Sequence, residues 1–120
     1  MFRVIIAGTR TFADYELLKG KMDAILSRKV DAGEDVVIVS GTARGADQLG
    51  ERYARERGYK IHAYPANWDA YGKAAGYKRN VQMAEHAEAC VVFWDGISRG
   101  SEHMCNIAKE HGLQLRIIRY

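Results

Sequence analysis

The sequence predicts an α/β fold, a Rossmann-like three-layer α/β/α sandwich built around a mainly parallel five-stranded sheet. Short segments rich in β-branched residues alternate with segments whose apolar residues recur at helical spacing. Two of the short segments, 36–40 (VVIVS) and 89–94 (ACVVFW), are apolar almost throughout, as is typical of strands covered by helices on both faces. A length of 120 residues, 48% of them hydrophobic, suits a single domain over residues 1–120.

Five strands are expected, and the first opens the chain. They cover residues 2–7, 36–40, 60–64, 89–94 and 114–119. The segment 60–64 (KIHAY) is shorter and more polar than the others, so we expect it at an edge of the sheet. Pro65, the single proline, ends it. If the strand order is 3-2-1-4-5, the order reverses between the first and the fourth strand.

Helices are expected over residues 14–30, 44–57, 78–87 and 101–111. In the first helix, an apolar stripe runs to a glycine C-cap at Gly33. The stripe consists of Leu17, Leu18, Met22, Ile25, Leu26 and Val30. The segment 66–77 is the longest irregular stretch, and it carries the aromatic residues Trp68, Tyr71 and Tyr77.

Composition excludes several classes of protein. A net charge of +3, from 18 basic and 15 acidic residues, is too mild for a duplex-DNA binder. No apolar stretch has the length of a membrane span, and the N-terminus lacks the basic region of a signal peptide. The two cysteines, Cys90 and Cys105, fall in expected core elements, and the four histidines lack ligand spacing. We therefore expect a cytoplasmic protein without a metal or a cofactor and without a membrane partner.

Glycine-rich turns after the apolar strands are the strongest functional signal. The turns 41–47 (GTARGAD) and 95–101 (DGISRGS) each lead from a strand into a helix, and Gly8 directly follows the first strand. Backbone N–H groups at a helix N-terminus attract phosphate groups. In a sheet of order 3-2-1-4-5, ligands bind beyond the carboxyl ends of the strands, where the strand order reverses. These turns therefore predict a nucleotide-like ligand.

Other side chains can complete such a pocket. Arg79 and Asn80 follow Gly76 at the expected start of a helix, where an arginine can reach a phosphate or form a surface salt bridge. Trp68 can stack on a base. The candidate ligand-binding residues are Gly8, Thr9, Arg10, Ser40, Gly41, Ala43, Arg44, Gly45, Asp47, Trp68, Arg79, Asn80, Asp95, Gly96, Ser98, Gly100 and Ser101. Ser101 can instead serve as the N-cap of the last helix.

Four segments together resemble one known family. GTRTFADYELL (8–18), SGTARGADQLGERYARERG (40–58), GKAAGYKRN (72–80) and FWDGISRGSEH (93–103) look like the YspA-type, cpYpsA-related members of the SLOG superfamily. Many members of this family are encoded by phages or mobile elements. The resemblance implies a Rossmann-like fold, a pocket for a nucleotide or an ADP-ribose-like molecule, and a homodimer.

Two branches of the superfamily give more specific expectations about function. In the LOG phosphoribohydrolases, a similar second turn reads Pro-Gly-Gly-x-Gly-Thr-x-x-Glu, and its Gly-Thr matches Gly100 and Ser101. The catalytic glutamate of that motif falls on Met104, and Glu102 lies roughly 200° away around the helix. DprA, which binds single-stranded DNA, resembles the chain at Ser40–Asp47 and Gly8–Arg10.

Three functions therefore stay open. The first is nucleotide binding by a sensor or sequestering module without catalysis, which the methionine at position 104 favours. The second is a nucleotide-processing enzyme, either an N-glycosidic phosphoribohydrolase or a phosphohydrolase that uses Asp47 or Asp95. The third is single-stranded DNA binding, for which a local basic patch is available. That patch consists of Arg10, Arg44, Lys73, Lys78, Arg79 and Arg99.

Overall fold

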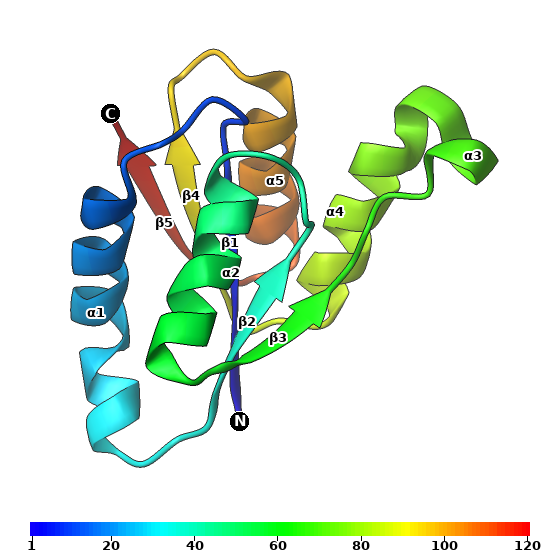
Figure 1. Cartoon of the computed structure of the whole chain (residues 1–120). Helices are drawn as coiled ribbons and strands as arrows, with labels where there is room; N and C mark the ends of the chain where they lie inside the picture. The colour runs from blue at the N-terminus through cyan, green and yellow to red at the C-terminus, as the bar shows by residue number, and fades with distance from the viewer.

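A computed structural model describes all 120 residues and contains one five-stranded sheet (Figure 1). The strands run in the order β3-β2-β1-β4-β5, and every neighbouring pair is parallel, which confirms the predicted parallel sheet. The polar strand β3 is at one edge, as expected, and β5 is at the other. The strands are β1 (Phe2–Gly8), β2 (Val36–Ser40), β3 (Lys60–Ala63), β4 (Ala89–Trp94) and β5 (Gln114–Arg119).

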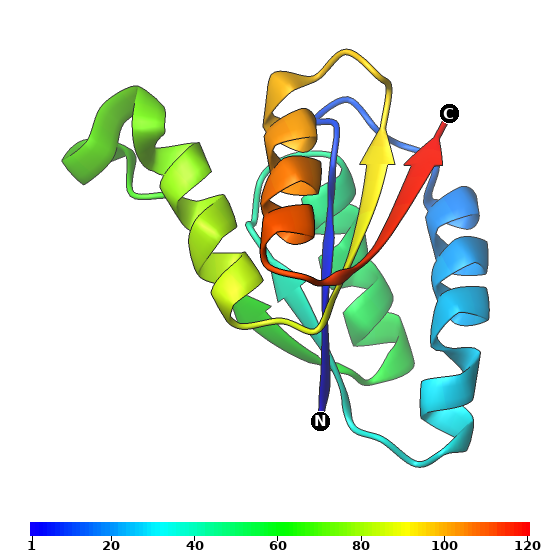
Figure 2. The same ribbon diagram turned by 180° about the vertical axis from the view of Figure 1, so that it is seen from behind.

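Helices cover both faces of the sheet and complete the predicted three layers (Figures 1 and 2). Helices α1 (Tyr15–Asp31) and α2 (Ala46–Arg57) lie on one face, and α4 (Ala75–Glu85) and α5 (Arg99–Glu110) lie on the other. Between β3 and α4 the chain forms a short helix α3 (Trp68–Tyr71) and a 3-10 turn η1 (Gly72–Ala74). No helix is long and apolar enough to cross a membrane.

Strand β1 shows why the sheet needs both helical layers. Its residues alternate between two apolar clusters: Val4 and Ile6 pack with α1 and α2, and Ile5 and Ala7 pack with α4 and α5. Successive side chains of a strand point to opposite faces, so a strand that is apolar throughout must be covered twice. The unbroken apolar runs in the sequence follow from this arrangement.

Three helix starts differ by two residues or more from the sequence-based prediction, and α2 begins at Ala46 instead of residue 44. Helix α4 begins at Ala75 instead of residue 78, because Gly76, a weak helix former, is accommodated in its first turn. Helix α5 begins at Arg99 instead of residue 101, and its N-cap is Ser98, whose hydroxyl accepts a hydrogen bond from the Ser101 N–H at 3.5 Å. The assignment of Ser101 as the N-cap is therefore wrong.

The segment expected to be irregular contains structure of its own. Asn67 caps α3 by accepting a hydrogen bond from the Ala70 N–H at 3.1 Å. An asparagine side chain at a helix start satisfies a backbone donor that would otherwise lack a partner. This cap holds the aromatic residues of α3 beside the carboxyl edge of the sheet, where the helix is seen to extend beyond the main body in Figure 1.

Candidate functional site

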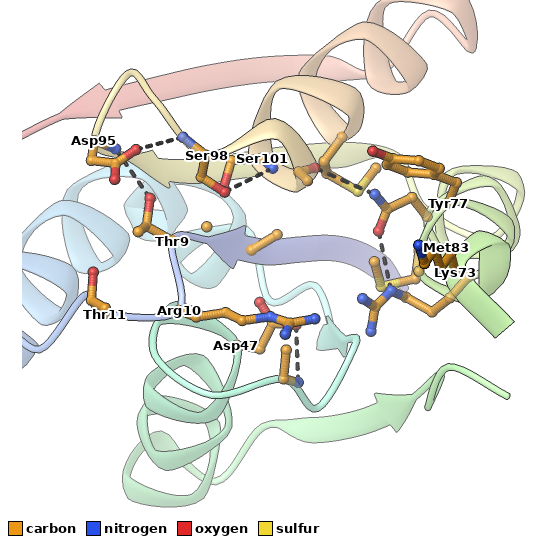
Figure 3. Close-up of a pocket in the computed structure, with 18 of the residues that line it drawn as sticks. Thr9, Arg10, Thr11, Asp47, Lys73, Tyr77, Met83, Asp95, Ser98 and Ser101 are labelled. Carbon is orange, nitrogen blue, oxygen red and sulfur yellow. Dashed lines mark hydrogen bonds between the residues drawn. The ribbon is translucent and has the colours of Figure 1, made fainter. Parts of the chain in front are cut away.

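A cavity of about 450 Å³ opens at the carboxyl ends of β1 and β4, where the strand order reverses (Figure 3). Parallel α/β sheets bind their ligands at this position. Its walls come from the loop after β1, the start of α2, the α3–α4 segment and the turn into α5. The lining residues are Ala7, Gly8, Thr9, Arg10, Thr11, Ala43, Asp47, Trp68, Lys73, Gly76, Tyr77, Arg79, Asn80, Met83, Asp95, Ser98, Gly100, Ser101 and Met104.

A second cavity of about 430 Å³ adjoins the first. The two share four lining residues, Arg10, Ala43, Trp68 and Arg79, so they are parts of one continuous cleft. The second cavity is also lined by Gly41, Thr42, Arg44, Gln48, Pro65 and Ala66. Most of the candidate residues thus line one cavity or the other, and Gly41 and Arg44 belong to the second.

Three candidate residues line neither cavity, and each has a structural role instead. The fully buried Ser40 hydroxyl donates to Glu51 Oε2 at 2.7 Å and accepts from the Thr42 N–H at 3.0 Å. A Cβ at Gly45, where φ is 78°, would overlap the carbonyl oxygen of Thr9. One at Gly96, where φ is 86°, would overlap the Arg119 guanidinium. These glycines build the turns by close packing, because only glycine adopts such backbone angles at little cost.

Arg79 is the most deeply placed cation of the cleft. It is only 8% exposed, and its guanidinium donates to the Gly41 carbonyl oxygen and to Asn80 Oδ1 at 3.1 Å. It forms no ion pair with any carboxylate. Burial lowers the pKa of Arg79, against the attraction of Asp47. A buried guanidinium that forms no ion pair, and whose nearest acidic influence is Asp47, lines both cavities.

Asp47 is the buried acid of the cleft. It is 4% exposed, and its Oδ2 accepts a hydrogen bond from the Ala43 N–H at 3.2 Å (Figure 3). Burial raises the pKa of Asp47 to about 6, although the Arg79 charge and the Ala43 hydrogen bond act in the opposite direction. Its charge therefore changes within the range of ordinary solution conditions, because the burial penalty outweighs its partners.

Asp95 organises the turn that leads into α5. Its Oδ1 accepts hydrogen bonds from the N–H groups of Ile97 at 2.8 Å and Ser98 at 2.9 Å, which hold the pKa of Asp95 below its usual value. Its own N–H donates to Thr9 Oγ1 at 3.1 Å, which links the loops after β1 and β4 (Figure 3). The first two N–H groups of α5, those of Arg99 and Gly100, have no partner within the protein.

The structure adds lining residues that the sequence analysis did not select. They come mainly from the α3–α4 segment, whose aromatic and basic composition was the available signal. In the first cavity they are Ala7, Thr11, Gly76, Tyr77, Met83 and Met104, together with Lys73, which the sequence analysis named only in the basic patch for DNA. Asn80 Nδ2 lies 3.1 Å from Nδ1 of His103, and the His103 ring lies 4.4 Å from that of Tyr77. Burial lowers the pKa of His103. No group of three His, Cys, Asp or Glu side chains is arranged to hold a metal ion.

Comparison with known proteins identifies relatives at the level of sequence and of fold. The model of the YspA, cpYpsA-related SLOG family matches residues 2–71. The Gene 61 protein of Mycobacterium phage D29 is 33% identical over 119 residues, which are 94% of this chain and 93% of that protein. The structure of DNA processing protein A (DprA) from Streptococcus pneumoniae is similar with a TM-score of 0.75 at 20% identity.

The similarity to DprA concerns the fold alone, because the sequence identity is low. It covers 99% of this chain and 50% of the DprA chain, so the protein described here spans half the length of that relative. The family model and the phage relative carry more weight, since the first covers over half of the chain and the second nearly all of it. They confirm the resemblance that the four sequence motifs predicted: the chain belongs to the YspA, cpYpsA-related SLOG family.

Proposed function

We propose that the cleft binds a nucleotide or an ADP-ribose-like molecule and that the protein acts as a sensor or sequestering module. The observation that carries this proposal is Arg79, a buried guanidinium that lines both cavities and pairs with no carboxylate. A charge removed from water is costly unless it is paired. A phosphate group in the cleft supplies the missing partner, because arginine binds phosphate through paired N–H donors.

The turn into α5 offers the first phosphate position. The free N–H groups of Arg99 and Gly100 lie at the N-terminus of a 12-residue helix, and the cavity wall beside them includes Ser98 and Ser101. A Cβ added at Gly100 would meet no atom within 4 Å, so this glycine leaves open space in front of the backbone. The helix dipole and the free donors together favour an anion here.

Aromatic side chains at the mouth of the cleft suit the base of a nucleotide. Trp68 is 50% exposed and Tyr77 is 45% exposed, and both line the first cavity. The Arg10 guanidinium, which also lines the first cavity, lies 6.0 Å from the centre of the Trp68 ring. Exposed aromatic faces stack on bases with little discrimination between them.

The same cleft is poorly equipped for hydrolysis. Met104, at the position of the LOG glutamate, is 1% exposed and lines the first cavity, where a thioether can neither transfer a proton nor stabilise a charge. A phosphohydrolase would need Asp47 or Asp95 as a base. Asp95 already accepts two backbone hydrogen bonds, which makes it a weak base. These features support binding over N-glycosidic hydrolysis, and Asp47, whose pKa burial raises to about 6, is the base that a phosphohydrolase would use.

Calorimetry with a panel of small molecules tests the proposal. The panel contains AMP, GMP, CMP, UMP and ADP-ribose, with the corresponding nucleosides as controls for the phosphate. We expect at least one phosphorylated compound to bind, and its nucleoside to bind at least about tenfold more weakly. Arg79→Ala should abolish the difference in affinity between the phosphorylated compound and its nucleoside. Arg28→Ala, which replaces an exposed arginine of α1, should leave that difference unchanged. Absence of binding by every compound would overturn the proposal.

Single-stranded DNA is a second candidate ligand, favoured by one specific observation. Arg10 and Arg44 line the second cavity without forming ion pairs, beside the exposed Trp68. A cationic groove with an aromatic platform is the common design of single-strand binders. This function predicts affinity that grows with strand length and falls steeply with salt, whereas a free nucleotide shows neither to the same degree.

We also propose that the protein forms a homodimer in the cytoplasm. The resemblance to the family supports the dimer. The two free, buried cysteines, Cys90 and Cys105, are consistent with a reducing compartment. Light scattering of the purified protein tests the dimer, and fractionation of expressing cells tests the location.

A further inference from the structure

The second cavity is large enough to hold part of a ligand of its own. It lies between the loop after β2 and the segment from Pro65 to Trp68, away from the α5 turn. Its volume of about 430 Å³ and the 450 Å³ of the first cavity each fall in the range of small-ligand pockets. A phosphate bound at the α5 turn therefore leaves a second space of similar size empty.

Charge in the second cavity is unbalanced. Three arginines line it, Arg10, Arg44 and Arg79, and no aspartate or glutamate does. None of the three forms an ion pair, whereas arginines elsewhere in the structure, such as Arg3 and Arg57, are paired with carboxylates. Like charges held close together destabilise one another, and Arg10 contributes to the lowered pKa of Arg79. This wall is therefore complementary to a second anionic group.

Arg79 connects the two cavities. Its guanidinium lines both, it is held by hydrogen bonds to Gly41 and Asn80, and its Nη2 has no hydrogen-bond partner in the protein. Trp68 and Arg10 line both cavities as well. A ligand that extends from one cavity to the other thus passes a half-exposed aromatic ring and a free N–H donor at the junction.

We propose that the two cavities form one bipartite site for a dinucleotide, in which the first nucleoside lies between its own 5′-phosphate and the phosphodiester that joins it to the second nucleoside. One phosphate lies in the first cavity, which the α5 turn and Arg79 both line, the second lies against Arg44, and the nucleoside between them lies beside Trp68. This inference rests on the proposed function, which requires the first cavity only.

The test compares the dinucleotides pApA, pGpG, pCpC and pUpU with their mononucleotides by calorimetry, on the full chain. The dinucleotide of at least one base should bind at least about tenfold more tightly than its mononucleotide, because it adds a charge-assisted contact. Arg44→Ala should lower dinucleotide affinity to the level of the mononucleotide and leave mononucleotide affinity unchanged. Arg28→Ala, which removes an exposed arginine of α1, is the matched control and should change neither.

The possible outcomes separate this inference from the function on which it rests. Equal affinities for each dinucleotide and its mononucleotide, or an equal loss of both in Arg44→Ala, would overturn the bipartite site and leave the proposed function standing. No binding by either class would overturn both. Affinity that continues to rise from dinucleotides to ten-residue strands would overturn the dinucleotide and identify a nucleic-acid strand as the ligand.

Discussion

Arg79 of α4 donates a hydrogen bond to the carbonyl oxygen of Gly41, which precedes it by 38 residues in the chain. This bond holds the loop after β2 against helix α4. The Cα of Gly41 faces both Arg79 and Asp47, since a Cβ there would lie 2.8 Å from both Arg79 Cζ and Asp47 Oδ2. The geometry of the cleft therefore depends on the absence of a side chain at position 41.

Gly41→Ala tests this dependence. The added methyl group should push the Arg79 guanidinium away from the Gly41 carbonyl, lower ligand affinity at least about tenfold and cost about 1–3 kcal/mol of stability through overpacking. Gly20→Ala is the matched control, because a Cβ at this exposed position of α1 meets nothing within 4 Å. It should stabilise the helix by about 0.5–1 kcal/mol and leave binding unchanged. Calorimetry and thermal unfolding measure both effects, and unaltered binding by Gly41→Ala would contradict the argument.

Gly100→Asp tests the phosphate position at α5. A carboxylate there should weaken nucleotide binding by at least about 2 kcal/mol, because it fills the space in front of the backbone and repels the phosphate. The fold should persist, since the side chain enters open space and an acidic group favours a helix N-terminus. Gly100→Asn, of nearly the same size but uncharged, separates the two causes and should show a smaller loss. If Gly100→Asp binds as well as the wild type, this turn serves structure alone.

Met104 provides a test of catalysis. The wild-type protein should release no detectable free base from nucleoside monophosphates, because its cavity lacks the glutamate of the LOG motif. Met104→Glu should gain a trace of activity where Arg79 and the sugar position are otherwise suitable, and Met104→Gln is the uncharged control. Chromatography after long incubation measures the base. Turnover by the wild type that Arg79→Ala abolishes would show that the protein is an enzyme in which another residue replaces the glutamate.

Asp47 predicts a pH dependence of binding. Its pKa of about 6 means that the carboxyl is neutral at about pH 5 and ionised at about pH 8, where its charge repels an anionic ligand. Affinity for ADP-ribose should therefore fall as the pH rises through 6, and Asp47→Asn should remove this change and keep the higher affinity at about pH 8. ADP-ribose is the suitable probe, because a phosphate monoester itself titrates near pH 6.

The same carboxyl predicts a change in stability. Its pKa in the folded protein lies above the value of 3.8 for a free aspartate, so the folded state binds the proton more tightly. The contribution of Asp47 to the free energy of unfolding is therefore greatest below pH 3.8 and is lost as the pH rises to about 6. Urea titrations at several pH values give the free energy of unfolding of the wild type and of Asp47→Asn. Across this range, the slope of that free energy against pH should differ between the two proteins. Equal pH dependence of the two proteins would show that Asp47 titrates normally, with Arg79, the Ala43 hydrogen bond and Arg10 balancing its burial.

The sequence determined the layers, the parallel sheet and the edge where the cleft lies, whereas the strand order comes from the structure. Strands such as β2 and β4 are apolar on both faces, which requires helices on each side of the sheet. Glycine turns placed after strands then mark the carboxyl edge, because parallel strands all end there. Both signals are local, because they lie in the spacing of apolar residues and in the position of glycines along the chain. They can therefore be recognised in one sequence.

Tertiary structure alone decided which residues of each turn face the cleft. Gly45 and Gly96 looked equivalent to Gly100 in the sequence, yet the first packs on Thr9 and the second on Arg119, and only Gly100 lines a cavity. The burial of Arg79 without an acidic partner, and its position between two cavities, follow from the docking of α4 beside the loop after β2. Such contacts join residues far apart in the chain, and no periodicity encodes them, because they depend on how whole elements pack.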